Sequence, residues 1–389
     1  MNGARLAGAL VAALALLAAP AGCGPNLRGT VDAEALRAVV ERVAVPFDAS
    51  APPDALVERL AAADLVVVGE HHGISEHGSA VASLVAALHA HGLRTLMLEY
   101  PQAVTWLLDG YARGMLDALD AAATATYGEL LAGVRAFNLT LPPDERVRVY
   151  AIDVNAHEDE ALPPLRGLMH QLGLPDLLVD AVAAIEAGEA RVAVLERVHE
   201  RLHDPAEALQ GAWGEARYQA VVDLVDAELR SLAVRSERTE RARDEARESL
   251  MHALVERYRA RADGPTLVNV GAYHAQRTSR DGTVDVWLAE RAHDAGAEVY
   301  SLRVTPTKGE LPRGDALQRV DVLDDSPPNE LLRVSVETFG HGRLFVPLHD
   351  PLFREERVVL SYLPRLDTEP PGLVFDGLLL LGEVHAIER

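Results

Sequence analysis

Short apolar runs that alternate with helical patterns constrain the fold of this 389-residue chain more than any other feature. Runs of strand length lie at positions 65–68, 95–98, 147–152, 267–270 and 298–304. A helical pattern at 78–91 ends before Gly92, the residue type that commonly closes helices in a left-handed conformation. Strands separated by helices predict one α/β domain with a mainly parallel sheet and right-handed crossovers.

The long segment from about 158 to 261 is almost entirely helical in pattern and rich in Ala, Leu, Glu and Arg. It is too long for a single crossover between two strands, so we predict a helical insertion. Shorter helices are expected at 32–43, 54–62, 102–132 and 284–295. After Thr305, proline-rich loops separate extended runs that we predict at 332–336, 358–362 and 373–381.

The N-terminus predicts secretion followed by lipid attachment. Arg5 supplies a positive start, residues 6–19 form an apolar run, and small residues precede Cys23 in a pattern that matches the bacterial lipobox, apart from Pro20. We therefore expect a signal peptide over 1–22, a lipidated Cys23 with a tether to residue 52, and the folded domain over 53–389. The expected location is the bacterial cell envelope, with a preference for the outer membrane facing the periplasm. A secreted chain with a spare cysteine is the alternative.

Composition and motif content exclude several classes of partner and mechanism. The formal net charge of −22 argues against binding to nucleic acid or, by charge, to anionic lipid. The single cysteine permits no intrachain disulfide. The chain has no Walker loop, no Rossmann fingerprint and no G-x-S-x-G nucleophile elbow. Nucleotide cofactors and a serine nucleophile are therefore not indicated.

Polar residues follow four of the predicted strands and form the candidate site. These residues are Glu70, His72, Glu99, Asp153 and His274. The carboxyl ends of parallel strands share one edge of a sheet, so we predict that these side chains converge there. Imidazole and carboxylate groups suit general acid/base catalysis, or a divalent metal held by His72, His274 and Glu99. The alternative is that each group satisfies only a neighbouring loop or helix end.

Two further patterns leave alternatives open. Adjacent residues on an extended backbone point to opposite faces, so we choose His72 over His71 as the site histidine. Opposite charges recur three and four residues apart over 235–248, which a solvated helix explains. In the alternative interpretation, Arg241 or Arg243 reaches into the site from this helix.

Three blocks of the chain resemble the superfamily that unites ChaN-like haem-binding lipoproteins, erythromycin esterases and TraB/Tiki proteins. Residues 69–72 (GEHH) resemble its opening G-E-x-H motif. Residues 98–102 (LEYPQ) resemble a segment in which a glutamate ends a strand and a helix follows. Residues 271–274 (GAYH) resemble its G-x-x-H motif, which follows an arginine-rich helix. The resemblance spans roughly 60–305. It implies cofactor-binding roles for His77, Tyr273 and Arg243.

Each branch of this superfamily implies a different mechanism. A ChaN-like protein would bind haem or a metal without turnover. A Tiki-like hydrolase would hold a metal with His72 and His274, while Glu70 or Glu99 activates water. An esterase-like hydrolase would use His72 as a general base, Glu99 to orient it and His274 near the developing oxyanion.

The lipobox and Gln102 are more similar to ChaN, whereas Asp153 and the helical insertion are more similar to the esterases. Our first hypothesis is an envelope-anchored lipoprotein that binds haem or a divalent metal ion. The alternative is a hydrolase that acts on a small-molecule substrate with the same residues.

The haem hypothesis makes a spectroscopic prediction. Protein purified with haem, or titrated with it, should develop a Soret absorption band. Absence of any haem uptake would contradict this hypothesis and leave the hydrolase.

Overall fold

The computed structural model describes most of the chain, and its described residues are 31–47, 52–119, 121–155, 176–204, 206–278, 284–313, 316–324, 329–358 and 369–387. The predicted signal peptide, Cys23 and the start of the predicted insertion lie outside these ranges. No helix among the described residues is both long and apolar enough to cross a membrane.

An eight-stranded sheet forms the centre of the protein, in the order β1-β9-β10-β6-β2-β5-β3-β4. The parallel strands are β2 (Leu65–Glu70), β3 (Thr95–Pro101), β4 (Arg148–Asp153), β5 (Thr266–Gly271), β6 (Val299–Thr305) and β10 (Gly377–Leu380). At one edge, β9 (Leu344–Pro347) pairs antiparallel with β10 and with β1 (Val45–Pro46). The predicted α/β class with a mainly parallel sheet is confirmed.

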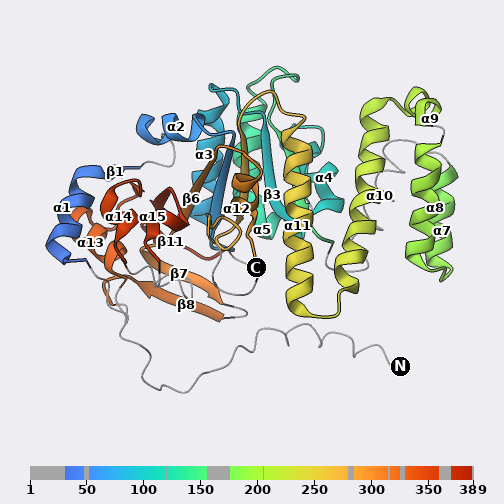
Figure 1. The fold of residues 1–389 in the computed structure, drawn as a ribbon. Coiled ribbons are helices and arrows are strands. Elements are labelled where there is room, and N and C mark those ends of the chain that lie inside the picture. Colours follow the sequence, from blue (N-terminus) through green and yellow to red (C-terminus); the bar gives the residue numbers. More distant parts are fainter. Residues whose placement is uncertain are drawn as a thin grey trace, which may run out of the picture.

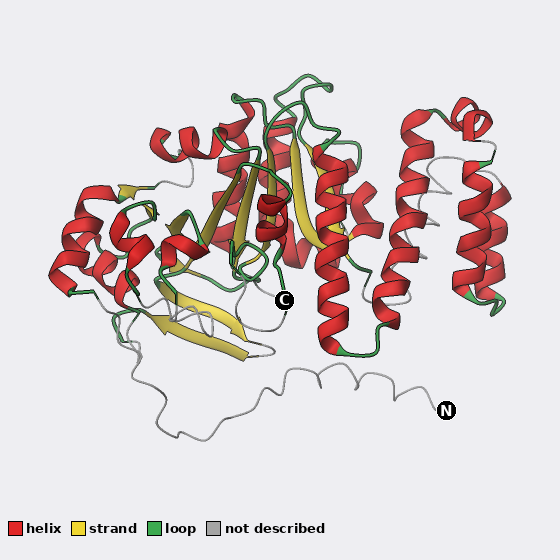
Figure 2. Ribbon diagram, viewed as in Figure 1, coloured by secondary structure: helices red, strands yellow, loops and turns green. Residues whose placement is uncertain are grey.

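Helices cover both faces of this sheet (Figure 2). Strand side chains alternate between the faces, so Val66 and Val68 join one apolar cluster and Val67 joins the other. The first cluster includes side chains from α2 (Asp54–Ala61), α3 (Ser75–His89), α4 (Thr105–Ala112) and α5 (Ala121–Asn138). The second includes side chains from α1 (Ala33–Val43), α11 (Glu240–Arg259), α12 (Leu288–Asp294), α13 (Glu330–Phe339), α14 (Pro351–Glu355) and α15 (Pro371–Val374). Burial on both faces explains why the central strands are continuous apolar runs.

A separate group of helices lies beyond the β4 edge (Figure 1). It comprises α7 (Asp176–Glu186), α8 (Arg191–His203), α9 (Ala206–Trp213) and α10 (Glu215–Ser236), and it leads into α11. These helices have their own apolar cluster, which includes Leu178, Leu202 and Val221. The fully buried Asn155, just after β4, donates to the buried Glu228 of α10 at 2.6 Å and so ties this group to the sheet. The predicted helical stretch is thus confirmed for its described residues.

A three-stranded sheet adjoins the main one, in the order β11-β7-β8. Its strands are β7 (Lys308–Arg313), β8 (Ala316–Asp321) and β11 (Glu383–Val384). Beyond β11, the chain bonds to the loop after β2, because Ile387 N donates to Gly73 O at 2.8 Å and Ser75 N donates to His385 O at 3.1 Å. A further G-x-x-H pattern, residues 382–385 (GEVH), therefore lies against the loop that follows the opening motif.

Some predicted elements were wrong. The expected extended run at 332–336 belongs to α13, which Asn329 caps by accepting from Leu332 N. Its buried side chains at 331, 332, 334, 335 and 336 include pairs three and four residues apart, and this helical spacing outweighs the β-branched residues among them. Of the run at 373–381, only Gly377–Leu380 is a strand, and 359–362 lie outside the described residues.

Helix boundaries also differed. The single helix expected at 102–132 is divided into a 3-10 turn (η1, Gln102–Val104), α4 and α5. The helix expected at 284–295 begins only at Leu288. The other predicted strands and helices were found within a few residues of their expected bounds.

Candidate functional site

The four strands that carry the predicted site residues are neighbours in the sheet, in the order β2-β5-β3-β4. From β3 the chain continues to β4 on one side, whereas from β5 it continues to β6 on the other. The carboxyl ends of β3 and β5 thus form a topological switch point, where open α/β sheets bind their ligands. The predicted convergence is confirmed by the contacts described next.

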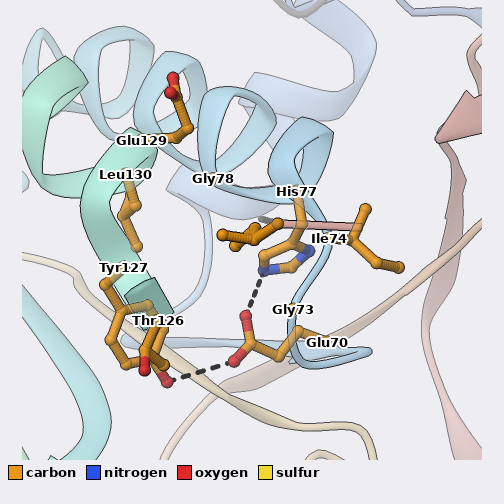
Figure 3. Close-up of a pocket in the computed structure, with 10 residues that line it drawn as sticks. Glu70, Gly73, Ile74, His77, Gly78, Thr126, Tyr127, Glu129 and Leu130 are labelled. Atoms are coloured by element: carbon orange, nitrogen blue, oxygen red, sulfur yellow. Dashed lines mark hydrogen bonds and ion pairs between the residues drawn. The ribbon is translucent and has the colours of Figure 1, made fainter. Parts of the chain in front are cut away.

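Glu70, at the end of β2, is a buried carboxylate that accepts three hydrogen bonds and forms an ion pair with His77. Its Oε1 accepts from His72 Nδ1 at 2.9 Å and from the Tyr127 hydroxyl at 3.1 Å. Its Oε2 accepts from Asn269 Nδ2 at 2.9 Å and lies 3.0 Å from His77 Nε2 (Figure 3). Burial alone would raise the pKa of Glu70, but the attraction of His77 and the bonds from both histidines hold this pKa well below its usual range. Glu70 is therefore an ionised anchor.

Glu99, at the end of β3, is the second buried carboxylate. Its Oε2 accepts from Gly271 N at 2.5 Å, and its Oε1 accepts from Arg247 Nη2 at 2.5 Å and lies 3.2 Å from His274 Nε2. Burial opposes ionisation, but His274 and Arg247 outweigh it and hold the pKa of Glu99 well below its usual range. A β-carbon on Gly271 would lie 3.1 Å from His72 Nε2 and 3.2 Å from Glu99 Oε2. The glycine thus allows these groups to approach each other.

His72 is the exposed member of the cluster. Its side chain is 55% exposed, whereas those of Glu70, Glu99 and His274 are at most 8% exposed. Its Nδ1 is held by Glu70, and its Nε2 lies 4.0 Å from Glu99 Oε2. Partial burial would lower the pKa of His72, but the bond to Glu70 and the two carboxylate charges raise it to about 9.

His274 lies between two carboxylates. Its Nε2 faces Glu99, and its Nδ1 is in ion-pair contact with Glu248 of α11. Burial would lower the pKa of His274, but the two negative charges raise it to about 10. The ring is therefore an imidazolium at neutral pH.

Asp153, at the end of β4, binds the site arginine rather than a site histidine. Its two carboxylate oxygens accept from Arg247 Nε and Nη2, both at 2.7 Å, in a bidentate pair. The same Nη2 reaches Glu99. Asp153 therefore holds Arg247 in place, and Arg247 in turn binds Glu99.

Comparisons with known proteins identify the fold. No family model and no curated protein matches the sequence. Among solved structures, a Bacillus cereus protein aligns with a TM-score of 0.69, 14% identity and coverage of 92% of this chain and 100% of the other. A succinoglycan biosynthesis protein aligns with a TM-score of 0.68, 13% identity and coverage of 91% and 98%. A mutant erythromycin esterase in its open conformation aligns with a TM-score of 0.57, 15% identity and coverage of 86% and 94%.

This chain has the erythromycin esterase fold. A haem-bound ChaN of Campylobacter jejuni aligns with a TM-score of only 0.29, too low to carry an argument. At such low identities, the likeness establishes the erythromycin esterase fold and leaves the function to the site.

The three predicted cofactor-binding residues lie in different surroundings. His77 is buried, and its Nε2 lies 2.7 Å from Asn269 Oδ1 as well as close to Glu70. Tyr273 packs against Trp287 at 5.7 Å between ring centroids. Arg243 is exposed, and Arg241 pairs with Asp285, so the arginine that enters the site is neither of the two considered.

The predicted metal role of His72, His274 and Glu99 finds no support in the geometry. Among the described residues, no group of three or more His, Cys, Asp or Glu side chains is placed to hold a metal ion. The oxygens of Glu70 and Glu99 already receive N–H or O–H donors, and two carboxylates hold the His274 ring. These contacts suit proton chemistry better than coordination.

Four site residues were missed by the sequence-based prediction: Tyr127, Arg247, Glu248 and Asn269. Asn269 had a signal, because it is an amide within an otherwise apolar buried strand. Arg247 lies one helical turn beyond Arg243, on the arginine-rich helix already under consideration. Tyr127 had no local signal, since it lies at an irregular point within α5.

Removing Arg247 should destabilise the protein, because Glu99 and Asp153 would lose their cation inside the fold. We expect Arg247→Ala to lower the free energy of unfolding by about 3 kcal/mol in urea titrations. The matched control is Arg243→Ala on the same helix, expected to stay within about 0.5 kcal/mol of the wild type. Equal effects of the two substitutions would contradict the assignment of Arg247 as the cation of the site.

Proposed function

We propose that the protein is a hydrolase in which His72 acts as a general base and activates water toward the carbonyl carbon of a small-molecule ester. The observation that carries this proposal is the pair formed by the buried, ionised Glu70 and the exposed His72. Glu70 binds Nδ1, so the neutral ring carries its lone pair on Nε2, on a side chain that water can reach.

The mechanism follows from this hydrogen bond. Nε2 of His72 takes a proton from water as the water oxygen bonds to the carbonyl carbon, and Glu70 stabilises the resulting imidazolium. The tetrahedral intermediate then expels the alkoxide, which receives the proton from Nε2. Glu70 itself is a poor base here, because three hydrogen bonds and the ion pair with His77 already engage its oxygens.

The roles of the two carboxylates differ from the sequence-based expectation. We expected Glu99 to orient His72, but Glu70 lies closer, at 2.9 Å against 4.0 Å. Glu99 instead holds His274 and Arg247. These two cations supply positive charge at the sheet edge, where negative charge would develop on the carbonyl oxygen.

The shared erythromycin esterase fold supports ester hydrolysis as the reaction class. The haem-binding hypothesis has weaker support, because Nε2 of the buried His77 is already engaged. The pocket that His77 lines with Tyr127 and Ile387 (Figure 3) has space for about one water molecule, far less than a haem needs. Attachment to the envelope through Cys23 stays a prediction, since that residue lies outside the described part of the chain.

Substitution of His72 tests the general base. A panel of aryl esters and macrolide lactones, including erythromycin, should reveal a substrate for the wild type. His72→Asn should then lower kcat/KM by about 100-fold or more, the usual contribution of a general base. His203→Asn, at an exposed histidine of α8, should leave kcat/KM unchanged. Full activity of a folded His72→Asn variant would remove His72 from the chemistry.

The pH dependence tests the pairing of His72 with Glu70. A general base must be neutral, so kcat/KM should rise with pH toward the His72 pKa of about 9. Glu70→Gln removes the negative charge that raises this pKa, so the rise should move to lower pH. Stopped assays in buffers from pH 6 to pH 10 would measure both profiles. An identical rise in the two proteins would mean that Glu70 does not set the basicity of His72.

A further inference from the structure

Glu248 is a buried carboxylate that the proposed mechanism does not yet use. It lies on α11 directly after Arg247 and is 1% exposed. Helix α11 packs against β3 and β4, which brings this carboxylate to the site from outside the sheet. Its place calls for a physical explanation, because an unpaired buried carboxylate is costly.

The compensating charge is His274. Oε1 of Glu248 is in ion-pair contact with Nδ1 of His274, while Glu99 faces Nε2 of the same ring at 3.2 Å. The second oxygen of Glu248 is buried and has no hydrogen-bond partner among the described residues. His274 is thus the main counter-charge of Glu248. Because each ring nitrogen faces a carboxylate, favourable contact on both sides requires a proton on both nitrogens.

We propose that Glu248 is a positioning residue that keeps His274 protonated on both nitrogens and fixes its ring against Glu99. In the hydrolase proposed above, His274 then presents a permanent positive charge beside His72. The catalytic part of this inference rests on the proposed function, whereas the effect of Glu248 on His274 does not.

Other charges around Glu248 and His274 determine how far the pKa of His274 depends on Glu248. His274 also faces Glu99 from β3 and His72 from the loop after β2, and Arg247 of α11 binds the same Glu99 carboxylate. Asp244, one turn earlier on α11, faces Glu248 and has a raised pKa because of its burial and its acidic neighbours. Loss of the Glu248 charge leaves Glu99 as the remaining anion against His274. The pKa of His274 should therefore fall, but Glu99 should still favour the imidazolium.

The experiment compares Glu248→Gln, which keeps the shape and removes the charge, with Glu248→Asp, which keeps the charge. The control is Glu256→Gln, two turns further along α11, where Glu256 pairs with Arg259. Imidazole nitrogen NMR would follow the His274 ring during pH titration, with His274→Asn to assign its signal. Glu248→Gln should weaken the proton affinity of His274 by about tenfold or more, about one unit on the pH scale. Glu256→Gln should stay near the wild type, and Glu248→Asp should show a smaller decrease than Glu248→Gln.

Kinetics supply the second readout. Glu248→Gln should lower kcat about tenfold with little change in KM, and the loss of activity at alkaline pH should begin at a lower pH than in the wild type. Partial rescue by Glu248→Asp would show that the charge matters rather than the packing. If Glu248→Gln leaves kcat and its pH dependence unchanged, Glu248 does not support catalysis through His274.

The outcomes separate the two proposals. If His274 titrates in Glu248→Gln as in the wild type, the positioning role is wrong, whatever the protein hydrolyses. If the wild type hydrolyses none of the esters, the proposed function fails, and the NMR titration still decides the role of Glu248. If Glu248→Gln does not fold, Glu248→Asp decides, because its longer distance to Nδ1 should weaken the proton affinity by a smaller but measurable amount.

Discussion

The buried Glu70 carboxylate is the interaction on which the rest of the site depends. Its four polar partners come from the loop after β2, from α3, from α5 and from β5, and those on α5 and β5 are distant from it in sequence. A buried carboxylate without such donors would cost several kcal/mol, so these elements must assemble around it together. Formation of the fold and preparation of the site are therefore one event.

Charges alternate across the site from one end to the other. Glu70, His72, Glu99, His274 and Glu248 follow one another, with ion-pair or near ion-pair contacts at each step. This order makes both histidines strongly basic, yet only His72 has its ring in solvent. Burial thus separates their roles: three carboxylates and the buried His274 imidazolium set the electrostatics, and the exposed His72 imidazole is left to exchange protons.

The glycines of the two sequence motifs have a steric role in this arrangement. A β-carbon on Gly69 would lie 2.8 Å from the Ala275 β-carbon, so only a glycine lets the loop after β5 pack over β2. Gly271 allows the approach of His72 to Glu99 and donates its N–H to the same carboxylate. The G-E-x-H and G-x-x-H patterns therefore describe two surfaces that fit together as well as two sets of reactive groups.

The sequence by itself determined the α/β class, the strands β2 to β6 and the polar residues at the ends of four of them. These features are local. An apolar run followed by Glu70, Glu99 or Asp153 predicts a buried strand with a carboxylate at its end, whichever residues that carboxylate later contacts. Only the tertiary structure decided that Glu70 rather than Glu99 holds His72, that Asp153 serves Arg247, and that α11 contributes Arg247 and Glu248. Charges spaced three and four apart fit a solvated helix and a site-facing helix equally well. The packing of α11 against the sheet, a long-range contact with no local signature, selects between them.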